Sequence, residues 1–423
     1  MNHSTPRVTH RLRSAIQPKT HGLIKAHWSR LGRWSSSAAS SKNVGSPHGS
    51  LHGLKVLDLS RVLAILADYG AEIIKIEAIG KGDDTRHFKM RGEDQAWKPG
   101  AGPMSNYFSS VNRNKKSVTL DIKNPRGKEI FVELLKQADV LANRLLIGHP
   151  PGYGTSGPYA KRGGYDPIAG AEAGLIHVTG EQNGPPVRPG IGMVDLATGL
   201  YLHGAILAAL HARERGGMGQ RVDASLFETQ VSLLTNVGLA WLNLGIEAQR
   251  WGCQHSSIVP YNAFKTKDKY LVGGATNDAQ FAGLCRLLGL ETLIDDERFA
   301  TNPKRVENRH LIDPIFNAAF GTKTADEWMQ LIGETTLPFA PINNIENTFT
   351  HPQIEARGMI AEMETDTAAS GQIRVIGPAV KFSETSPSLR APPPALGQHT
   401  VEVLGTLGID AKEVDQLRQN GVV

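Results

Sequence analysis

A single carboxylate, Asp195, stands in a mostly apolar stretch between Glu181 and Glu214. It directly precedes the apolar segment Leu196–Leu200, which is typical of the start of a helix. One interpretation is structural, because an Asp at the N-cap accepts a hydrogen bond from a free backbone N–H. The other is chemical, because a carboxylate that a helix N-terminus keeps ionised can act as a nucleophile. The two interpretations are compatible.

Motifs that would indicate a bound cofactor or metal are incomplete, because they lack the flanking elements, the required residue or the ligand spacing. Gly152–Gly157 has the spacing of a dinucleotide-binding loop, but it follows two prolines and runs into Pro158, so neither a strand nor a helix flanks it. Gly80 and Lys81 are followed by Gly82, where a phosphate-binding loop needs Ser or Thr. The 15 histidines are scattered without metal-ligand spacing. The sequence therefore predicts no metal and no permanently bound cofactor.

Composition and charge limit the class of protein. The chain has 423 residues, of which 40% are hydrophobic and 6% aromatic, and this predicts a folded globular protein with two domains or one large irregular domain. Residues 1–50 contain eight Lys or Arg and no acid, while the whole chain carries a net charge of +5, so residues 51–423 sum to −3. The folded part has no basic surplus, and we therefore expect no nucleic-acid partner. Cys253 and Cys285 are too few for a disulfide framework.

The N-terminal segment has the composition of a targeting sequence. Residues 1–46 are rich in Arg, His and Ser, lack acid and contain two short basic amphipathic stretches, Val8–Ile16 and Leu23–Trp34. This is typical of a mitochondrial transit peptide, although a disordered basic tail has the same composition. We therefore expect the protein in the mitochondrial matrix. The longest apolar stretches, around 205–210 and 231–244, are shorter or more interrupted than the roughly 20 residues that a bilayer requires, so no membrane association is expected.

The segments that must position Asp195 alternate between strand and helix patterns. Short apolar runs at Lys55–Leu59, Ala71–Glu77 and Ser117–Asp121 are typical of buried strands. A helix pattern over Pro125–Gln137 leads to a further strand that begins at Asp139–Leu141. Such alternation predicts an α/β domain with a parallel sheet.

Two long helices and a smaller α/β unit follow in the sequence. The apolar patterns predict helices over Leu196–Glu214 and Ser225–Leu244, separated by a glycine-rich break. After Ile258 the pattern restarts as strand, turn and strand, and then as helices up to about Asn347. The run Pro392–Pro394 predicts a rigid linker instead of a helix.

Ordered motifs along most of the chain resemble one enzyme family. They are the segments Leu54–Ala64, Gly70–Glu77, Gly82–Arg86, Asn112–Ser117, Gly164–Asp166, Gly190–Gly199, Gly219–Asp223, Ala340–Asn343 and Leu396–Thr400. By these motifs the chain is identified as a member of the family III CoA-transferases, with a resemblance that covers about residues 51–423. The sequences of the segments Ser110–Pro125 and Gly252–Thr266 are most similar to those of family members that use succinyl-CoA and glutarate.

The resemblance implies a fold and an assembly. It implies a Rossmann-like large domain with a parallel sheet, a smaller α/β domain, and subunits that pair as an interlocked homodimer. The corresponding limits are 51–205 plus 385–423 for the large CoA-binding domain, 206–254 for a helical linker, 255–345 for the small domain and 346–384 for a return linker.

The resemblance also implies a reaction, the transfer of CoA from an acyl-CoA to a free dicarboxylic acid, with Asp195 as the matching nucleophile. A carboxylate that attacks a thioester forms a mixed anhydride and releases a CoA thiolate, which then returns to give aspartyl-CoA. Because one thioester replaces another, the exchange needs neither ATP nor a metal. Acyl-CoA is a substrate here and not a resident cofactor.

Further site residues are carried over from the family by position. Those expected to contact CoA are Arg61, Val62, Ala64 and Asn143. Those expected to contact the acyl group, or to cover it from the loop at 252–257, are Tyr165, Asp166, His255 and Ser256. A second carboxylate on the substrate needs a cation, for which Arg113 is the first choice, with Arg188 and His255 as alternatives.

Two segments of the family pattern are missing from the chain. Between Ala64 and Gly70 the chain is about eight residues shorter than the family pattern, which has a Gly-Pro turn and a full helix there, and this removes a helix N-terminus that would face the CoA pyrophosphate. A helix and a parallel strand are lacking after Asn143. An inactive CoA-binding chain is therefore one alternative. An acyl-CoA racemase of the same fold is another, but Tyr165 stands where racemases carry the His that serves as second base.

Overall fold

The computed structural model describes residues 49–60, 64–142 and 152–423. The expected transit peptide at 1–46 lies outside the described residues, and so do Arg61, Val62 and Asn143 of the expected CoA site.

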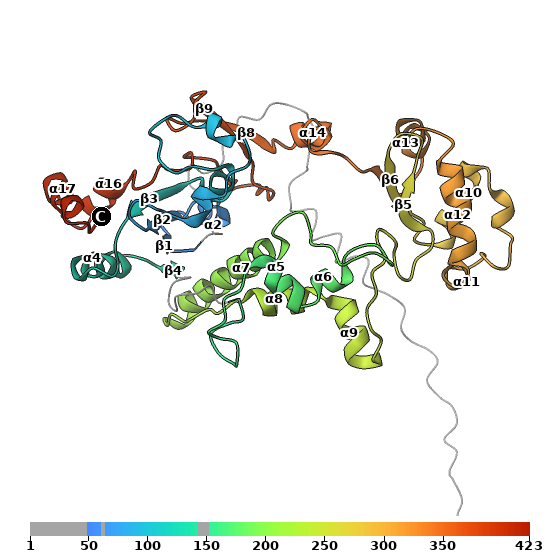
Figure 1. Ribbon diagram of the computed structural model, residues 1–423, viewed down its shortest axis with the longest axis horizontal. Helices are drawn as coiled ribbons and strands as arrows, with labels where there is room; N and C mark the ends of the chain where they lie inside the picture. Colours follow the sequence, from blue (N-terminus) through green and yellow to red (C-terminus); the bar gives the residue numbers. More distant parts are fainter. Residues whose placement is uncertain (1–48, 61–63, 143–151) are drawn as a thin grey trace, which may run out of the picture. The chain divides into compact units, whose positions relative to one another are not determined.

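Four parallel strands form a sheet in the order β3-β2-β1-β4 (Figure 1). The strands are β1 Lys55–Asp58, β2 Glu72–Glu77, β3 Lys115–Thr119 and β4 Val140–Ala142. The register places Asp58 of β1 beside Lys75 of β2 and beside Ala142 of β4. The predicted parallel α/β sheet is thereby confirmed, and each strand overlaps the run predicted for it or directly adjoins it.

Helices cover both faces of this sheet, and the strand residues alternate between the two cores. Leu57 and Ile74 belong to a core that includes residues of α4, α16 and α17, whereas Val56 and Ile73 belong to a core with α2 and α7. The helices are α2 Ala64–Asp68, α4 Pro125–Lys136, α7 Met193–Gly216, α16 Thr400–Gly405 and α17 Ala411–Gln419. A sheet buried on both faces accounts for the nearly continuous apolar runs of its strands.

A second layer of short elements lies beside the sheet and joins distant parts of the sequence. Trp97, Met104 and Phe108 form a small core against Ile373 of the hairpin β8-β9. The elements of this layer are η1 Asp84–His87, η2 Glu93–Ala96, α3 Asn106–Asn112, β8 Ile360–Glu364 and β9 Gln372–Ile376. The short helices α14 Ile345–Phe349 and α15 Pro352–Ala356 precede β8 in the chain.

A group of helices carries Asp195, namely α5 Asp166–Glu172, α6 Leu175–Val178, α7, α8 Leu226–Leu233 and α9 Thr235–Leu244. The helix predicted over Ser225–Leu244 is in fact two helices. Thr235 has a φ of +44°, and a β-branched residue in this left-handed region interrupts a helix. In the part of the chain that the structure describes, α7 is the one helix long and apolar enough to cross a membrane by length and composition.

The antiparallel strands β5, β6 and β7 form a second sheet. Its core is aromatic, with the rings of Phe264 and Phe320 stacked at 4.5 Å between centroids and Trp328 packed on Phe320. The elements of this unit (Figure 1) are β5 Tyr261–Lys265, β6 Tyr270–Gly274, α10 Asp278–Leu288, η3 Glu291–Leu293, α11 Asn302–Glu307, α12 Arg309–Phe320, α13 Ala325–Gly333 and β7 Phe339–Pro341.

Candidate active site

Asp195 lies in the first turn of α7 and its side chain is partly buried. The N-cap of this helix is Gly192, which makes no side-chain hydrogen bond. The prediction that Asp195 itself is the N-cap is therefore wrong, because the helix begins at Met193 and not at Leu196. In the first turn a carboxylate still lies at the positive end of the helix dipole, which stabilises its ionised form.

The structure brings Asp166 next to the start of α7. Its Oδ2 accepts hydrogen bonds from the backbone N–H groups of Val194 at 2.8 Å and of Asp195 at 3.1 Å. Asp166 is only 9% exposed, whereas the neighbouring Tyr165 is 60% exposed. Two of the residues that the sequence assigned to the site, Asp166 and Asp195, are thus direct neighbours.

A buried cluster of charges surrounds Asp58 at the carboxyl end of β1. Lys115 Nζ donates to Asp58 Oδ2 at 2.8 Å, and Lys75 Nζ donates to Asp83 at 2.7 Å and to the carbonyl of Ser60 at 2.8 Å. Asp58 in turn accepts from the backbone N–H and the hydroxyl of Ser60. The cluster therefore fixes the last described residue before Arg61.

The pKa directions in this cluster follow from burial and pairing. Burial would raise the pKa of Asp58, but the charges of Lys115 and Lys75 outweigh it and lower that pKa. Burial would lower the pKa of Lys75, but Asp58 and Asp83 outweigh it and raise that pKa. Burial prevails for Lys115, whose pKa is lowered despite Asp58. Sequence reasoning missed this cluster, although Lys75 inside the predicted strand Ala71–Glu77 was a usable signal, since a buried lysine needs a partner.

The described residues that adjoin the expected CoA segments lie at the carboxyl ends of β1 and β4. The backbone N–H of Leu59 donates to the carbonyl of Ala142 at 2.9 Å, so the ends of β1 and β4 lie side by side. The segment with Arg61 and Val62 follows the first strand, and Asn143 follows the second. Ala64 begins α2. Ligands of open α/β sheets bind at the carboxyl ends of the strands, which is where both segments start.

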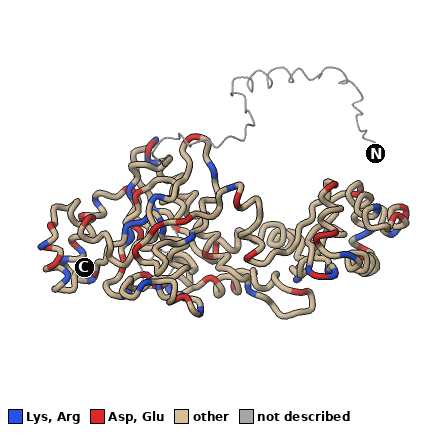
Figure 2. Tube along the Cα trace, turned by 90° about the horizontal axis from the view of Figure 1, so that it is seen from above, with Lys and Arg blue, Asp and Glu red and all other residues tan. Residues whose placement is uncertain are grey.

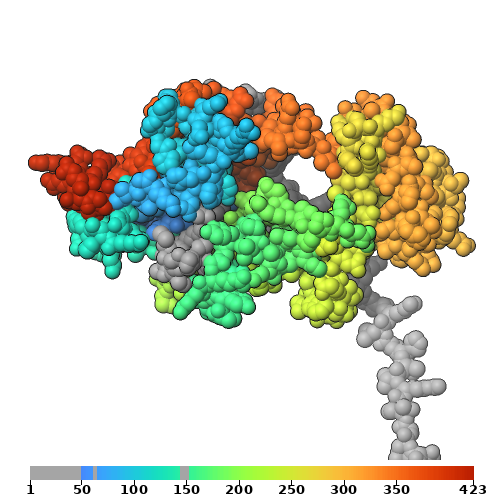
Figure 3. All heavy atoms as spheres, in the orientation of Figure 1, coloured from blue at the N-terminus to red at the C-terminus, as the bar shows by residue number. Residues whose placement is uncertain are grey.

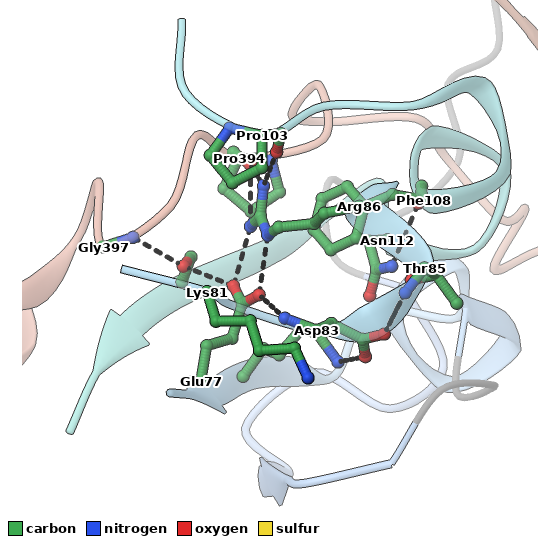
Figure 4. A network of polar contacts seen from close by, with 12 residues as sticks. Glu77, Lys81, Asp83, Thr85, Arg86, Pro103, Phe108, Asn112, Pro394 and Gly397 are labelled. Carbon is green, nitrogen blue, oxygen red and sulfur yellow. Dashed lines mark hydrogen bonds and ion pairs between the residues drawn. The ribbon is translucent and has the colours of Figure 1, made fainter. Parts of the chain in front are cut away.

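Arg86, the last residue of the motif Gly82–Arg86, forms a buried ion pair with Glu77 at the end of β2 (Figure 4). Its hydrogen bonds to Pro394 also join β2 to the C-terminal segment. Arg86 donates to both carboxylate oxygens of Glu77 at 2.7 Å and to the carbonyl of Pro394 at 3.2 Å, and its guanidinium lies 3.6 Å from the centroid of the Phe108 ring. Burial would raise the pKa of Glu77, but Arg86 outweighs it and lowers that pKa. These motif residues therefore support the fold.

Arg113, the first choice for binding a distal carboxylate, is engaged elsewhere. It is 8% exposed, donates to Asp68 Oδ1 at 3.1 Å and Oδ2 at 2.5 Å, and donates to the carbonyl of Ser110 at 2.8 Å. A guanidinium that already binds a buried carboxylate bidentately is poorly placed to bind a second one. Arg188 is exposed in the loop that leads into α7, and it stays a prediction together with His255.

The loop at 252–257 is fastened to α12. Arg309 donates to the carbonyls of His255 at 2.7 Å and Ser256 at 3.1 Å and to Gln254 Oε1 at 3.2 Å. The imidazole of His255 stacks on Tyr261 with 5.4 Å between centroids. Part of the loop borders a cavity of about 650 Å³, which Cys253, Gln254, Trp251, Glu181 and Asn183 help to line.

Within residues 49–60, 64–142 and 152–423, no three His, Cys, Asp or Glu side chains are grouped so that they could hold a metal ion. Acidic and basic residues are interspersed along the traced chain (Figure 2).

Comparison with known proteins places the chain in one family. The model of CoA-transferase family III matches residues 51–145 and 141–400. An acyl-CoA transferase of Fusarium pseudograminearum is 55% identical over 419 residues, with 92% of each chain covered, and the human succinyl-CoA:glutarate CoA-transferase is 42% identical over 422 residues, with 93% of each covered. A crystal structure of a CaiB/BaiF family protein from Brucella suis has a TM-score of 0.71 and 31% identity, covering 85% of this chain and 100% of that one. The chain belongs to CoA-transferase family III.

Proposed function

We propose that this protein transfers CoA from succinyl-CoA to a free dicarboxylic acid, with glutarate as the acceptor, and that Asp195 is the nucleophile. The observation that carries the proposal is the partly buried carboxylate in the first turn of α7. There the helix dipole favours the ionised and therefore nucleophilic form. The names of the human and mouse relatives, both 42% identical, support the choice of substrates.

The steps need only this carboxylate and the two substrates. An oxygen of Asp195 attacks the succinyl carbonyl, the C–S bond breaks, and a succinyl-aspartyl anhydride and CoA thiolate form. The thiolate attacks the aspartyl carbonyl, which releases succinate and leaves aspartyl-CoA. Glutarate attacks that carbonyl and expels the thiolate, and the thiolate then attacks the glutaryl carbonyl, so glutaryl-CoA leaves and the Asp195 carboxylate is restored. The site must chiefly keep water from the anhydrides.

CoA is proposed to bind at the carboxyl edge of the parallel sheet through Arg61, Val62, Ala64 and Asn143. The buried pairs of Lys75 and Lys115 support this placement, because they fix the end of β1 immediately before this segment. No permanently bound cofactor is proposed.

Product analysis tests the proposed reaction. Full-length protein with succinyl-CoA and glutarate is expected to form glutaryl-CoA and succinate in equal amounts. Chromatography of the CoA thioesters measures the conversion over time. Acetate in place of glutarate is the matched acceptor without a second carboxylate and is expected to react much more slowly. A protein that transfers CoA to no carboxylic acid would contradict the proposal, and inversion of a chiral 2-methylacyl-CoA would favour the racemase alternative.

We also propose that a second copy of the chain covers the apolar surface of α7 and α9. Only 17% of the apolar part of α7 is buried, and its residues Leu200 and Tyr201 are more than half exposed. On α9, Leu242 is 76% and Leu244 is 70% exposed. Figure 3 shows residues of this part of the chain, coloured green to yellow, at the molecular surface. Apolar surface of this extent is typical of an interface.

Sedimentation at micromolar concentration tests this assembly. The full chain is expected to sediment as a homodimer, and the double variant Leu200→Asp with Leu242→Asp is expected to sediment as a monomer, because two charges would be buried at the interface. Met90→Asp is the control, since Met90 is equally apolar and 76% exposed but lies outside α7 and α9. A monomeric parent would contradict the dimer, and flotation of that monomer with lipid vesicles would assign the apolar surface to a membrane.

Residues 1–46 are proposed to direct the chain to the mitochondrial matrix. Their basic, acid-free composition supports this proposal. Sequencing of the mature protein isolated from mitochondria is expected to give an N-terminus near residues 36–47, and an N-terminus at Met1 would contradict the proposal.

A further inference from the structure

We infer that Asp166 is a positioning residue, whose carboxylate holds the start of α7 and thereby sets the direction of the Asp195 side chain. The inference rests on the proposed role of Asp195 as nucleophile. It goes beyond the expectation that Asp166 lines the acyl pocket, because it gives the carboxylate a structural role, namely holding the backbone N–H groups of Val194 and Asp195.

The first turn of α7 depends on Asp166 for its hydrogen bonds. The first backbone N–H groups of any helix have no partner within the helix. Here the N-cap is Gly192, which makes no side-chain hydrogen bond, and Oδ2 of Asp166 accepts from Val194 and Asp195 instead. One of these two N–H groups belongs to the nucleophile itself. The cap therefore fixes the backbone from which the reactive side chain projects.

Glycine at position 192 supplies no side-chain cap of its own. A Cβ on Gly192 would lie 3.6 Å from Oδ2 of Asp166 and 3.7 Å from Cβ of Asp195, which is ordinary van der Waals contact, so space alone does not require glycine here. The oxygen of a Ser or Asp at this N-cap would instead compete with Asp166 for the N–H groups of Val194 and Asp195. The first turn of α7 is therefore capped by Asp166, a residue distant in sequence, and not by its own N-cap residue Gly192.

The backbone that carries Asp166 is itself held in place. Asp166 is in the first turn of α5, and Pro167 occupies the next position, where its fixed φ suits a helix start. Ala169 and Val194 are fully buried, and a Cβ on Gly170 would contact Cγ2 of Val194 at 3.7 Å, so α5 packs directly on the first turn of α7. The position of the cap is therefore set by close packing.

Such a cap has a kinetic consequence. Attack on a thioester requires the carboxylate oxygen about 3–3.5 Å from the carbonyl carbon, and a displacement of about 1 Å can cost roughly 10²-fold in rate. Loss of the cap is therefore expected to lower kcat for CoA exchange while leaving KM nearly unchanged, because neither substrate needs Asp166 for binding in this role.

Two variants and two readouts test the inference. In Asp166→Ala, the Val194 and Asp195 amides are expected to exchange hydrogen with solvent at least about tenfold faster than in the parent. The same variant is expected to lose about 10²-fold in kcat with KM values within about threefold. Asp166→Asn keeps an acceptor oxygen and is expected to stay within about tenfold of the parental kcat, since Asn caps helices about as well as Asp.

Asp410→Ala is the matched control. Asp410 caps α17 through the backbone N–H of Glu413 at 2.8 Å, so its loss removes the same kind of bond from a different helix and should leave kcat unchanged. Amide exchange at the parental rate in Asp166→Ala would overturn the inference, and so would a parental kcat in that variant. A parent protein that does not exchange CoA at all would contradict the proposed function. The hydrogen exchange of the Val194 and Asp195 amides would still decide whether Asp166 holds the start of α7.

Discussion

Replacing Asp195 by Asn is expected to lower the rate of CoA exchange between succinyl-CoA and glutarate by about 10⁴-fold or more. The amide keeps nearly the same shape but has no anionic oxygen to attack the thioester, and no anhydride can form. Asp195→Ala is expected to lose as much. The rate of glutaryl-CoA formation measures the effect in both variants.

Asp326→Asn is the control for this substitution. Asp326 is also an acidic residue in the first turn of a helix, α13, and its pair with Lys269 is exposed. It is expected to keep the parental rate, because an exposed pair of this kind contributes only about 0–1 kcal/mol to stability. If Asp195→Asn exchanges CoA as fast as this control does, Asp195 serves the helix and not the chemistry.

Replacing Arg86 by Met is expected to destabilise the protein by about 3–5 kcal/mol. The guanidinium is fully buried and binds both oxygens of Glu77, so its removal leaves a buried carboxylate without its charged partner (Figure 4). It also removes the hydrogen bonds to Pro394 in the C-terminal segment. The shift of the urea midpoint, taken with the slope of the transition, measures the change in free energy of unfolding.

Arg126→Met is the matched control for this variant, because Arg126 of α4 also pairs with the C-terminal part of the chain, through Glu413 of α17, but does so at the surface. It is expected to cost less than about 1 kcal/mol. If Arg86→Met fails to fold, the double variant Arg86→Met with Glu77→Gln is measured instead. This variant has no unpaired carboxylate and is expected to regain part of the lost stability, since the effects of the two substitutions on the free energy of unfolding are coupled. A cost for Arg86→Met equal to that of the surface control would contradict the account of this pair.

The elements of the sheet could be predicted because their signal is local. Each strand is a short apolar run, and Asn124 with Pro125 marks the start of α4 as caps do in isolated helices. The break between α8 and α9 gave no such signal, because Thr235 is an ordinary residue whose positive φ reflects its surroundings in the folded chain. Sequence patterns therefore predicted where elements lie better than where they are interrupted.

The partners within the site could not be read from the sequence, because they come from distant segments. Asp195 was assigned the N-cap since it directly precedes an apolar helix, whereas Asp166 on another helix supplies the acceptor. Arg113 looked available for a substrate carboxylate, whereas Asp68 binds it. In both cases the sequence showed the charged side chain, and its partner became visible only in the fold.

Trapping of the covalent intermediate tests the central claim most directly. Full-length protein incubated with succinyl-CoA alone and then with hydroxylamine should carry an aspartyl hydroxamate on the peptide that contains Asp195, because hydroxylamine attacks the activated aspartyl carbonyl of aspartyl-CoA. Mass spectrometry of the digested protein locates the modification. The account predicts this product in the parent and in the Asp326→Asn control, and its absence in Asp195→Asn. Rapid CoA exchange by a parent whose Asp195 peptide stays unmodified would contradict the account.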